Sequence, residues 1–422
     1  MALQNFDLTS IAFKRDPYPT FARMRAAGPV VRVKLPLIGE AWAATTYEAA
    51  VDVLRDQKQF ALEPRHAGRK NFAGMKWWMP RSLRVLTKNM LTTDEPDHRR
   101  LRSLVEQAFQ RQSVNEMRPR LVALAGRFLD HFEAAALADN GRADLMEHFA
   151  KPFPLAVICE LLGLPEEDRA KFSRFASGLT NASSPWSILR AMFGIRKLLR
   201  YLKEQLAVCR RRPRPGVISA LVEAEQDGQR LSEDELLAMA FLLLFAGHET
   251  TVHLIATGVH NLLRHPDQKD RLLHDWSLAE SAVNETLRYV SSIQFTKPRY
   301  VRQDAEKYGV SLKRGEMVFA LLGSANVDPA QFEEPETFDI GRQPNRHLGF
   351  GGGIHVCLGF KLATAETAIA LESLFTRFPD LELAVPEEEL RWLKRMGTRG
   401  FLELPLRLRP QATGPTAGRH AD

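Results

Sequence analysis

Cysteine is scarce in this chain, which has three among its 422 residues. Cys159, Cys209 and Cys357 lie far apart, and no pair has the CxxC spacing of a redox or zinc motif. A disulfide framework is therefore excluded, and the sparse, odd count favours a reducing compartment, the cytoplasm.

A long apolar run is also missing. The N-terminal segment lacks the charged head and the apolar stretch of a signal peptide. The most apolar stretch, Leu236 to Gly247, is too short to span a bilayer and runs into His248 and Glu249. We therefore expect no transmembrane segment.

Neither sign of charge is in large excess. Lys and Arg total 58 against 51 Asp and Glu, which gives a formal net charge of +7. The sequence contains neither a helix-turn-helix signal nor zinc-finger spacing, so nucleic acid is not an expected partner. Hydrophobic residues make up 45% of the chain, which is enough for a large buried core.

Helical patterning dominates most of the chain. Apolar residues recur at helical spacing from about Tyr47 to Tyr289, whereas short β-like segments appear after about Ile293. A hairpin is predicted earlier, over residues 29–44, and a further helix over about residues 358–378. The predicted fold class is therefore mainly α with a small β region.

The domain organisation is expected to be simple, because the chain shows no internal repeat and no obvious linker. We predict one domain over residues 21–409, preceded by an irregular lead-in over residues 1–20. Residues 410–422 are expected to form a disordered tail.

One predicted helix is unusually long. Ser232 is followed three residues later by Glu235, which is the spacing of a capping box at a helix N-terminus. The periodic pattern continues to His265, where Pro266 ends it, a length of roughly 50 Å at 1.5 Å per residue. Because the segment is apolar on most faces, it must be buried in a large protein.

The middle of this helix reads AGHETT, residues 246–251. Gly247 weakens the helix by about 1 kcal/mol relative to alanine. Thr250 can bond back to a carbonyl one turn earlier and bend the helix, which would widen a groove for dioxygen and water. Glu249 places an acid beside that alcohol, which suits a proton relay. The alternative is a core helix with a tolerated kink and an exposed glutamate.

The strongest chemical signal is FGGGIHVCLG, residues 350–359. Three consecutive glycines allow a tight turn, and Cys357 then lies just before a predicted helix, whose N-terminal amides favour a thiolate. Gly359 lets a large group approach the backbone. A single thiolate with no second ligand at zinc spacing suits an axial haem ligand. The alternative is a buried cysteine that packs as a small hydrophobic side chain.

This turn resembles the cysteine signature of the cytochrome P-450 family, Phe-x-x-Gly-x-x-x-Cys-x-Gly. Phe350, Gly353, Cys357 and Gly359 match every fixed position, and the resemblance extends from about residue 17 to residue 408. It implies a haem b cofactor (iron protoporphyrin IX) with Cys357 as the thiolate ligand of the iron.

The resemblance also implies which residues surround the haem. They are His98, Arg102, Arg299, Phe350, Gly351, His355 and Gly359. His98 and Arg102 are spaced i,i+4, so they lie on one helix face and can both meet the negative propionates. Arg302 competes with Arg299 as a propionate ligand.

The AGHETT segment is similar to the family's central-helix motif at each position. This similarity implies that Thr250 stabilises bound oxygen and that Glu249 helps to deliver protons. It favours a monooxygenase over the peroxide-using branch of the family, which lacks the pair. The substrate contacts that the family resemblance implies include Ala246, Gly247, Ile293 and Phe401.

A structural trio follows from the same resemblance. Glu285 and Arg288 are spaced i,i+3 on one helix face, which by itself is a common surface pair. In the family this pair meets an arginine of the coil before the cysteine, which would be Arg342 here. The trio would hold that coil against the core.

The activity that these features imply is insertion of one oxygen atom of O2 into a lipophilic small molecule, by hydroxylation or epoxidation. No flavin or nicotinamide domain fits beside the haem domain, so electrons are expected from a separate ferredoxin and its reductase. Arg346 and Lys361 could serve as basic docking contacts. The alternatives are oxidative coupling, C–C cleavage or peroxygenation, and a haem sensor without turnover is disfavoured.

Two segments carry an excess of positive charge. Residues 62–91 hold seven Lys or Arg and one Glu, and residues 190–214 hold nine Lys or Arg and one Glu. The alternative is that both segments are solvated faces of the protein. The hypothesis is that they meet an anion, which could be a substrate carboxylate, an acidic carrier protein or a membrane surface.

Overall fold

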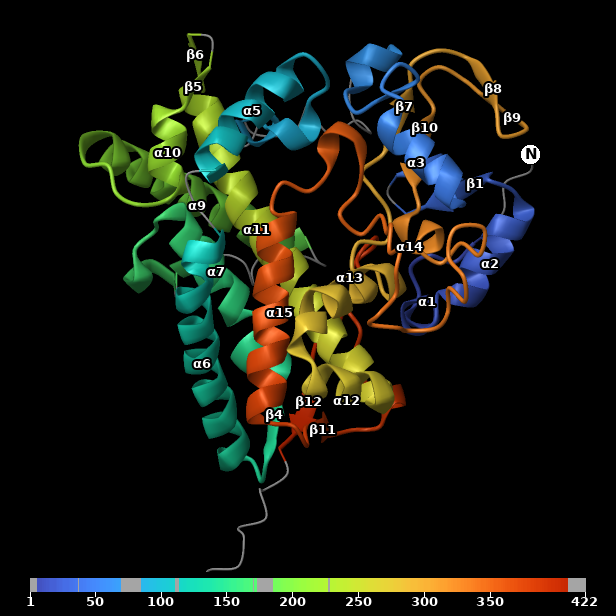
Figure 1. Cartoon of the computed structure of the whole chain (residues 1–422). Helices are drawn as coiled ribbons and strands as arrows, with labels where there is room; N and C mark the ends of the chain where they lie inside the picture. Colours follow the sequence, from blue (N-terminus) through green and yellow to red (C-terminus); the bar gives the residue numbers. More distant parts are fainter. Residues whose placement is uncertain are drawn as a thin grey trace, which may run out of the picture.

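The computed structural model describes residues 6–36, 38–69, 85–110, 114–169, 171–172, 185–226 and 228–408. Helices form most of this part of the chain, and the strands form four separate small sheets (Figure 1). The predicted fold class, mainly α with a small β region, is therefore confirmed. The α-helices are α1 (Ile11–Arg15), α2 (Tyr18–Ala27), α3 (Tyr47–Arg55), α5 (Asp97–Gln110), α6 (Val114–Ala138), α7 (Pro152–Leu162), α9 (Pro185–Arg211), α10 (Val217–Glu223), α11 (Glu233–Arg264), α12 (Pro266–His274), α13 (Ala279–Tyr289), α14 (Leu322–Ala325) and α15 (Phe360–Arg377).

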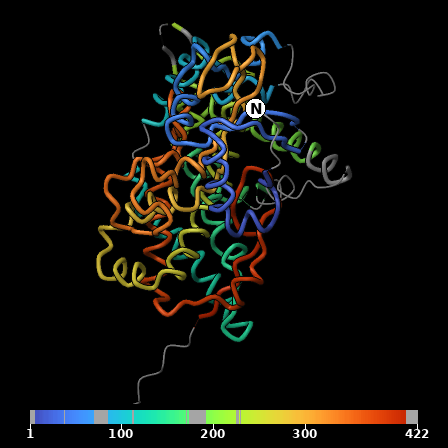
Figure 2. The backbone as a smooth tube through the Cα atoms, turned by 90° about the vertical axis from the view of Figure 1, so that its right-hand side faces the viewer, coloured from blue at the N-terminus to red at the C-terminus, as the bar shows by residue number. Residues whose placement is uncertain are grey.

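The main sheet joins segments that are far apart in the sequence. Its strands run in the order β1-β2-β10-β7-β3, with β1 (Val30–Leu35), β2 (Gly39–Ala44), β3 (Phe60–Ala61), β7 (Arg299–Val301) and β10 (Met317–Ala320). Strands β1 and β2 form the predicted hairpin, and β10 pairs with β2 in parallel. Figure 2 shows the N-terminal segment in blue beside the orange segment that contains β7 and β10.

Smaller strand pairs complete the β region. A second sheet has the order β11-β12-β4, and two further hairpins pair β5 with β6 and β8 with β9. The bounds of these strands are β4 (Arg142–Asp144), β5 (Glu225–Gln226), β6 (Gln229–Arg230), β8 (Ala305–Lys307), β9 (Val310–Leu312), β11 (Glu382–Leu383) and β12 (Pro405–Arg407).

Helix α11 is the axis of the hydrophobic core. Its N-cap is Ser232, whose side chain accepts from the Glu235 amide while the Glu235 carboxylate accepts from the Ser232 amide, so the predicted capping box is present. The helix packs against α7, α9, α13 and α15, and α6 and α15 run side by side in Figure 1. Its length and composition would suit a membrane span, but 72% of the apolar window is buried inside the protein, as in a core helix.

The predicted irregular lead-in is wrong where the structure describes it. Ser10 accepts a hydrogen bond from the Phe13 amide and caps α1, and α2 begins at Tyr18. Phe13 and Lys14 are buried, so this short helix is part of the fold and not a loose end. The predicted tail, residues 410–422, lies outside the described residues.

The three cysteines are free, and two of them are buried. Cys159 is fully buried in α7 among apolar side chains, which agrees with the apolar helical run that surrounds it in the sequence. Cys209 is also buried, although its place beside Arg210, Arg211 and Arg212 in the sequence suggests an exposed thiol. Cys357 is half-buried.

Candidate functional site

The turn before Cys357 depends on two glycines. Gly351 and Gly353 have φ angles of 75° and 65°, in the region that side chains with a Cβ rarely adopt. A Cβ on Gly353 would also collide with the carbonyl oxygen of Leu54, at the end of α3. The Cys357 amide donates to the Phe350 carbonyl at 2.9 Å, which closes the turn and fixes where the thiol lies.

The Cys357 thiol is not made acidic by the protein alone. Burial raises its pKa, and a hydrogen bond from the Gly359 amide and the charge of Arg102 only partly oppose this. The sequence-based expectation that the helix N-terminus would favour a thiolate is therefore corrected for the metal-free thiol. A metal ion deprotonates a coordinating thiol outright, so this pKa does not prevent ligation. A Cβ on Gly359 would meet nothing within 4 Å, so space lies beside the sulfur-bearing turn.

Two histidines meet beside this turn without hydrogen-bond partners. The rings of His98, on α5, and His355 lie 4.3 Å apart between centroids. Neither ring nitrogen of His98 nor Nε2 of His355 has a partner among the described residues, and the Glu95 carboxylate is 3.9 Å from His98 Nδ1. Burial lowers the pKa of both imidazoles. Buried polar atoms are rarely left without partners, so these nitrogens point to a ligand.

Arg299 adds a buried cation to the same cluster. It is 3% exposed on β7, no described carboxylate lies within ion-pair distance of it, and burial lowers its pKa to about 10. Its charge acts on the His355 imidazole. Arg302, in contrast, lies 3.7 Å from the Asp94 carboxylate and is about one-third exposed. The geometry therefore favours Arg299 over Arg302 as an anion ligand.

Arg102 is already engaged within the protein. Its Nε lies 2.6 Å from Glu106, and its Nη1 donates to the Val356 carbonyl at 2.6 Å. It therefore ties α5 to the residue before Cys357. It can still contribute charge to an anion held by His98 and Arg299.

The donor set fits the two propionates of a haem. Burying a cation without a counter-charge is costly, and His98, His355 and Arg299 supply donors in excess of the acceptors that surround them. A half-buried cysteine on a glycine turn lies two residues from one of these donors. Together they match a planar cofactor that has a metal and anionic side groups.

The middle of α11 has accessible residues although most of the helix is buried. Ala246 and Thr250 are exposed, and the Thr250 hydroxyl donates to the Ala246 carbonyl at 2.9 Å, as predicted. Glu249 is only 9% exposed and forms an ion pair with Arg395. The alternative of an exposed glutamate is therefore wrong. Sequence reasoning missed Arg395, because nothing local links it to a residue 146 positions away.

The predicted substrate contacts separate into two groups. Ala246 is exposed and Ile293 is half-buried, so both have surface that a ligand could touch. A Cβ on Gly247 would lie 2.8 Å from Cδ1 of Ile158, so this glycine lets α11 approach α7 closely. Phe401 is 1% exposed and packs against Trp392 in the core. Substrate contact is therefore no longer assigned to Gly247 and Phe401.

The predicted trio forms a closed network. Glu285 and Arg288 are fully buried and joined by two hydrogen bonds of 2.8 Å. Arg342 Nε lies 3.2 Å from the Glu285 carboxylate, and Arg288 also donates to the carbonyls of Pro335 and Thr337. The interpretation as a surface pair is wrong, and the network holds the coil before the cysteine turn.

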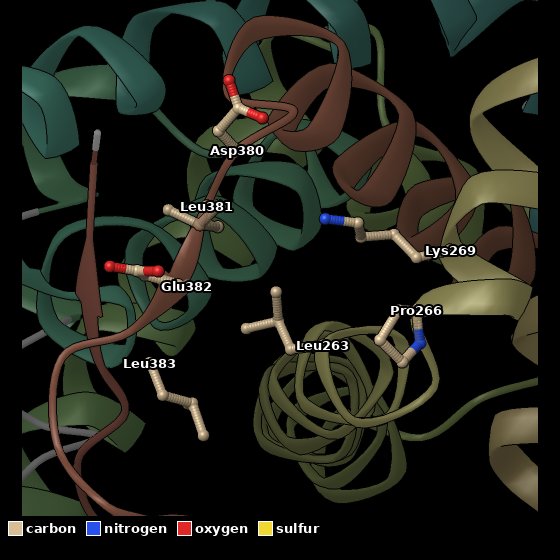
Figure 3. A pocket seen from close by; sticks show the side chains of 7 residues that line it. All are labelled: Leu263, Pro266, Lys269, Asp380, Leu381, Glu382 and Leu383. Atoms are coloured by element: carbon tan, nitrogen blue, oxygen red, sulfur yellow. The ribbon is translucent and has the colours of Figure 1, made fainter. Parts of the chain in front are cut away.

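A hollow of about 410 Å³ lies elsewhere, at the C-terminal end of α11 (Figure 3). Its walls include Leu263, Pro266 and residues 380–383, and Lys269 donates to the Pro379 carbonyl beside it. Thirteen residues of α11, roughly 20 Å at 1.5 Å per residue, separate Leu263 from Thr250. With no cysteine or histidine in its walls, this hollow is not the candidate active site.

Comparisons with known proteins identify the family to which this chain is similar. The family model described as Cytochrome P-450 matches residues 28–406. The chain is 39% identical to the cytochrome P-450 monooxygenase PikC of Streptomyces venezuelae, over 96% of this chain and 94% of that protein. It is 37% identical to the polyketide biosynthesis cytochrome P-450 PksS of Bacillus subtilis, over 94% of this chain and 96% of that protein.

Solved structures agree with these matches. The PksS structure covers 96% of this chain and 100% of its own, with a TM-score of 0.86 and 36% identity. P450BioI in complex with hexadec-9Z-enoic acid ligated acyl carrier protein covers 94% of this chain and 100% of its own, with a TM-score of 0.83 and 34% identity.

Proposed function

Because the chain belongs to the cytochrome P-450 family, whose members bind haem b through a cysteine thiolate, we propose that it oxygenates a lipophilic small molecule by hydroxylation or epoxidation. In that reaction the substrate, O2, two electrons and two protons give the oxygenated product and water. The electrons come from a separate ferredoxin and its reductase.

The observation that carries this proposal is the cluster of buried donors beside the cysteine turn. Cys357 would be the thiolate ligand, and His98, His355 and Arg299 would bind the propionates. Gly359 and Gly351 would let the macrocycle approach the backbone, with Phe350 packing at the turn. When bound, the haem supplies the metal at which dioxygen is activated, and the thiolate favours O–O cleavage.

The protein's own part in oxygen activation is to hold and move protons. The Thr250 hydroxyl donates to the Ala246 carbonyl, so its oxygen keeps lone pairs that can accept from a water or a bound ligand. Glu249 stands next to it, buried and held by Arg395. A positioned acid–alcohol pair of this kind typically contributes about 10²–10⁴-fold to a rate limited by proton transfer.

The electron donor is proposed to dock over the cysteine turn. Val356 and Phe360 are exposed apolar side chains on either side of Cys357, and Arg346 and Lys361 are exposed cations nearby. An acidic ferredoxin would meet an apolar centre with a basic rim there. Both proteins would share the cytoplasm, which suits three free cysteines.

The basic face of α9 is proposed to receive an acidic carrier protein that presents the substrate. Lys197 and Arg200 are exposed, Arg196 is half-exposed, and none has an ion-pair partner among the described residues. P450BioI, a structural relative, is known in a complex with a lipid-loaded carrier protein. Neutralising Arg196, Lys197 and Arg200 together should weaken binding of a carrier-linked acyl chain in low salt but not that of a free one. Equal binding of the carrier-linked chain by variant and parent would contradict this. The other basic segment, residues 62–91, lies partly outside the described residues.

The proposed function is tested by binding and turnover together. A panel of fatty acids, terpenoids, steroids and macrolides is screened by the spin shift of the haem, and each binder is then incubated with NADPH and a surrogate ferredoxin pair. We expect an oxygenated product, and a Thr250→Ala variant that consumes NADPH but yields much less product. Binders without any oxygenated product would instead support a sensor or a carrier.

A further inference from the structure

A stripe of polar side chains runs along one face of α11, from Glu249 towards the C-terminal end of the helix. Glu249, His253, Thr257, His260 and Arg264 all fall within an arc of roughly 80° at 3.6 residues per turn. The first four are buried, in a helix whose other buried side chains are mostly apolar. Outside the stripe, the buried polar side chains of α11 are limited to Thr251 and Asn261.

The segment 391–401 covers this stripe. A Cβ on Gly400 would collide with the His253 ring, so a glycine is needed where the segment crosses that histidine. Phe401 packs against the His260 ring with 4.9 Å between centroids, and the Arg395 side chain pairs with Glu249 at the inner end. Segment 391–401 therefore covers the stripe at His253 and His260 and pairs with it at Glu249.

The two histidines of the stripe have incompletely satisfied nitrogens. His253 Nδ1 is buried and has no hydrogen-bond partner among the described residues. His260 Nε2 is also buried, and its nearest described acceptor is the Glu387 carboxylate at 3.5 Å, at the outer limit of a hydrogen bond. Leaving such an atom unsatisfied costs about 1–3 kcal/mol, so a polar molecule small enough to fit is expected at each. Water meets that requirement, since buried waters typically bridge otherwise unsatisfied polar groups.

The outer end of the stripe opens into a cavity of about 370 Å³. Thr257, His260 and Arg264 line it, and so does Glu387, whose carboxylate lies 3.5 Å from His260 Nε2 and 3.1 Å from Arg264 Nε. Glu387 is partly exposed, so it can exchange protons with solvent. Two further buried donors in the cavity wall, Asn261 Nδ2 and Trp392 Nε1, also lack partners.

We propose that this stripe, Glu387–His260–Thr257–His253–Glu249, is a proton entry route that reloads Glu249 from solvent. The inference rests on the proposed function, in which Glu249 gives up protons. His260 and Glu249 are eleven residues apart, about 16 Å along the helix. Neighbours spaced i,i+4 have Cβ atoms about 5–6 Å apart, a gap that a single water can bridge.

Burial keeps the histidines neutral, as a relay requires, and most of the surrounding charges act in the same direction. Burial lowers the pKa of His253 to about 4, and the charges of Arg395, His248, Lys151 and Lys14 act in the same direction. Burial also lowers the pKa of His260, where Glu387 opposes the shift and Arg264 and Arg399 add to it. A neutral imidazole can accept a proton at one nitrogen and release one from the other.

The route carries protons only. Two protons are consumed per oxygenation, and each enters from solvent at Glu387 and leaves Glu249 towards Thr250. Every imidazole and carboxylate returns to its starting protonation state, and no electron passes along the stripe. A reaction driven by H2O2 already contains its two protons, so it needs no net supply through this route.

The test compares three variants of the haem-loaded enzyme. His253→Leu and His260→Leu remove the relay nitrogens at similar volume, and His253→Gln restores a hydrogen-bonding side chain. The control is His274→Leu on α12, where the exposed imidazole bonds only to a carbonyl of its own helix. We expect product per NADPH to fall at least threefold in both Leu variants and the solvent isotope effect to rise. H2O2-driven turnover should be unchanged, and His253→Gln should recover most of the loss.

A second readout does not depend on turnover. A crystal structure of the haem-loaded enzyme, at a resolution that shows water, should place ordered waters on His253 Nδ1 and His260 Nε2. A dry stripe would overturn the proposal. If His253→Leu fails to fold, the same measurements are made on His260→Leu and Glu387→Gln, and the same loss of product per NADPH is expected.

Failure of the route and failure of the proposed function can be told apart. A parent enzyme that lacks a thiolate-bound haem, or makes no oxygenated product, removes the proposed function. A parent enzyme that oxygenates its substrate, with NADPH coupling unchanged in the Leu variants, removes only the proton route.

Discussion

Two buried charge clusters of this molecule differ in how completely they are satisfied. Glu285, Arg288 and Arg342 form a network in which each charge meets an opposite charge or a carbonyl. His98 and His355, beside Arg299, have ring nitrogens without partners. Both clusters lie near the coil that leads to Cys357, yet only the first is complete within the protein.

The difference teaches how to tell a structural cluster from a binding one. In a closed network, hydrogen bonds and ion pairs within the protein offset the free energy of desolvating its charges, so the network can hold a coil in place without any ligand. In an open cluster, that desolvation free energy is not offset until an anion binds. Removing a residue of the closed network should therefore destabilise the protein with or without haem. Removing a residue of the open cluster should lower only the stability of the haem-bound protein.

The largest effect is expected in the closed network. Arg288→Ala would leave the Glu285 carboxylate buried without its main partner, which typically costs about 3–5 kcal/mol. Chemical unfolding should show this loss with or without haem. The matched control is Arg271→Ala, which breaks an exposed pair with Asp339 and should cost at most about 1 kcal/mol. Equal losses in both variants would contradict the comparison.

A substitution in the open cluster should affect the haem-free and the haem-bound protein differently. Arg299→Met removes a buried cation that has no carboxylate within ion-pair distance among the described residues and only the more distant charge of Asp94 to oppose its burial, so the haem-free protein should be as stable as the parent or more stable. Haem binding should weaken by about 2–5 kcal/mol, the usual cost of removing one partner of a buried charge pair. Transfer of haem to apomyoglobin measures this. Arg302→Met is the control, and a larger loss of haem from it would reverse the assignment.

Two glycines of the cysteine turn allow the same comparison between a structural role and a ligand-binding role. Gly353→Ala should destabilise the protein by about 1–2 kcal/mol or more in both states, because its φ of 65° is strained for alanine and a Cβ would meet Leu54. Gly359→Ala should leave the haem-free protein nearly unchanged, since its Cβ would meet nothing within 4 Å. It should weaken haem binding. A haem-free protein destabilised equally by both changes would show that the space beside Gly359 has no ligand role.

The smallest expected effect is a pH dependence. Burial lowers the pKa of His253 from 6.5 to about 4, so the unfolded chain binds more protons than the folded protein between these values. The free energy of unfolding must therefore fall as the pH drops below 6.5, by about 1 kcal/mol from pH 7 to pH 5.5 for this group. His253→Gln should remove that part of the slope in denaturant titrations. An unchanged slope would mean that His253 titrates normally in the fold.

Local signals carried most of what could be predicted from the sequence. The capping box at Ser232, the hairpin over residues 29–44 and the turn before Cys357 are each specified by neighbouring residues, and each is present. The back-bond of Thr250 also follows from its position within one helix.

What could not be predicted depends on contacts between distant segments. Helix α1 was missed because it is short and is held by Lys14, which donates to the Arg395 carbonyl at 3.0 Å across the whole chain. The burial of Phe401 and the pairing of Arg395 with Glu249 have the same origin. Segment 391–401 carries no local motif, so its place over α11 appears only in the folded structure.

The central claim is that Cys357 ligates a haem. The most direct measurement is the difference spectrum of the reduced protein with carbon monoxide, recorded for the parent and for Cys357→Ala. The account predicts a strongly red-shifted Soret band in the parent that is absent from the variant. A parent without a haem band, or a band that survives the loss of Cys357, would contradict it.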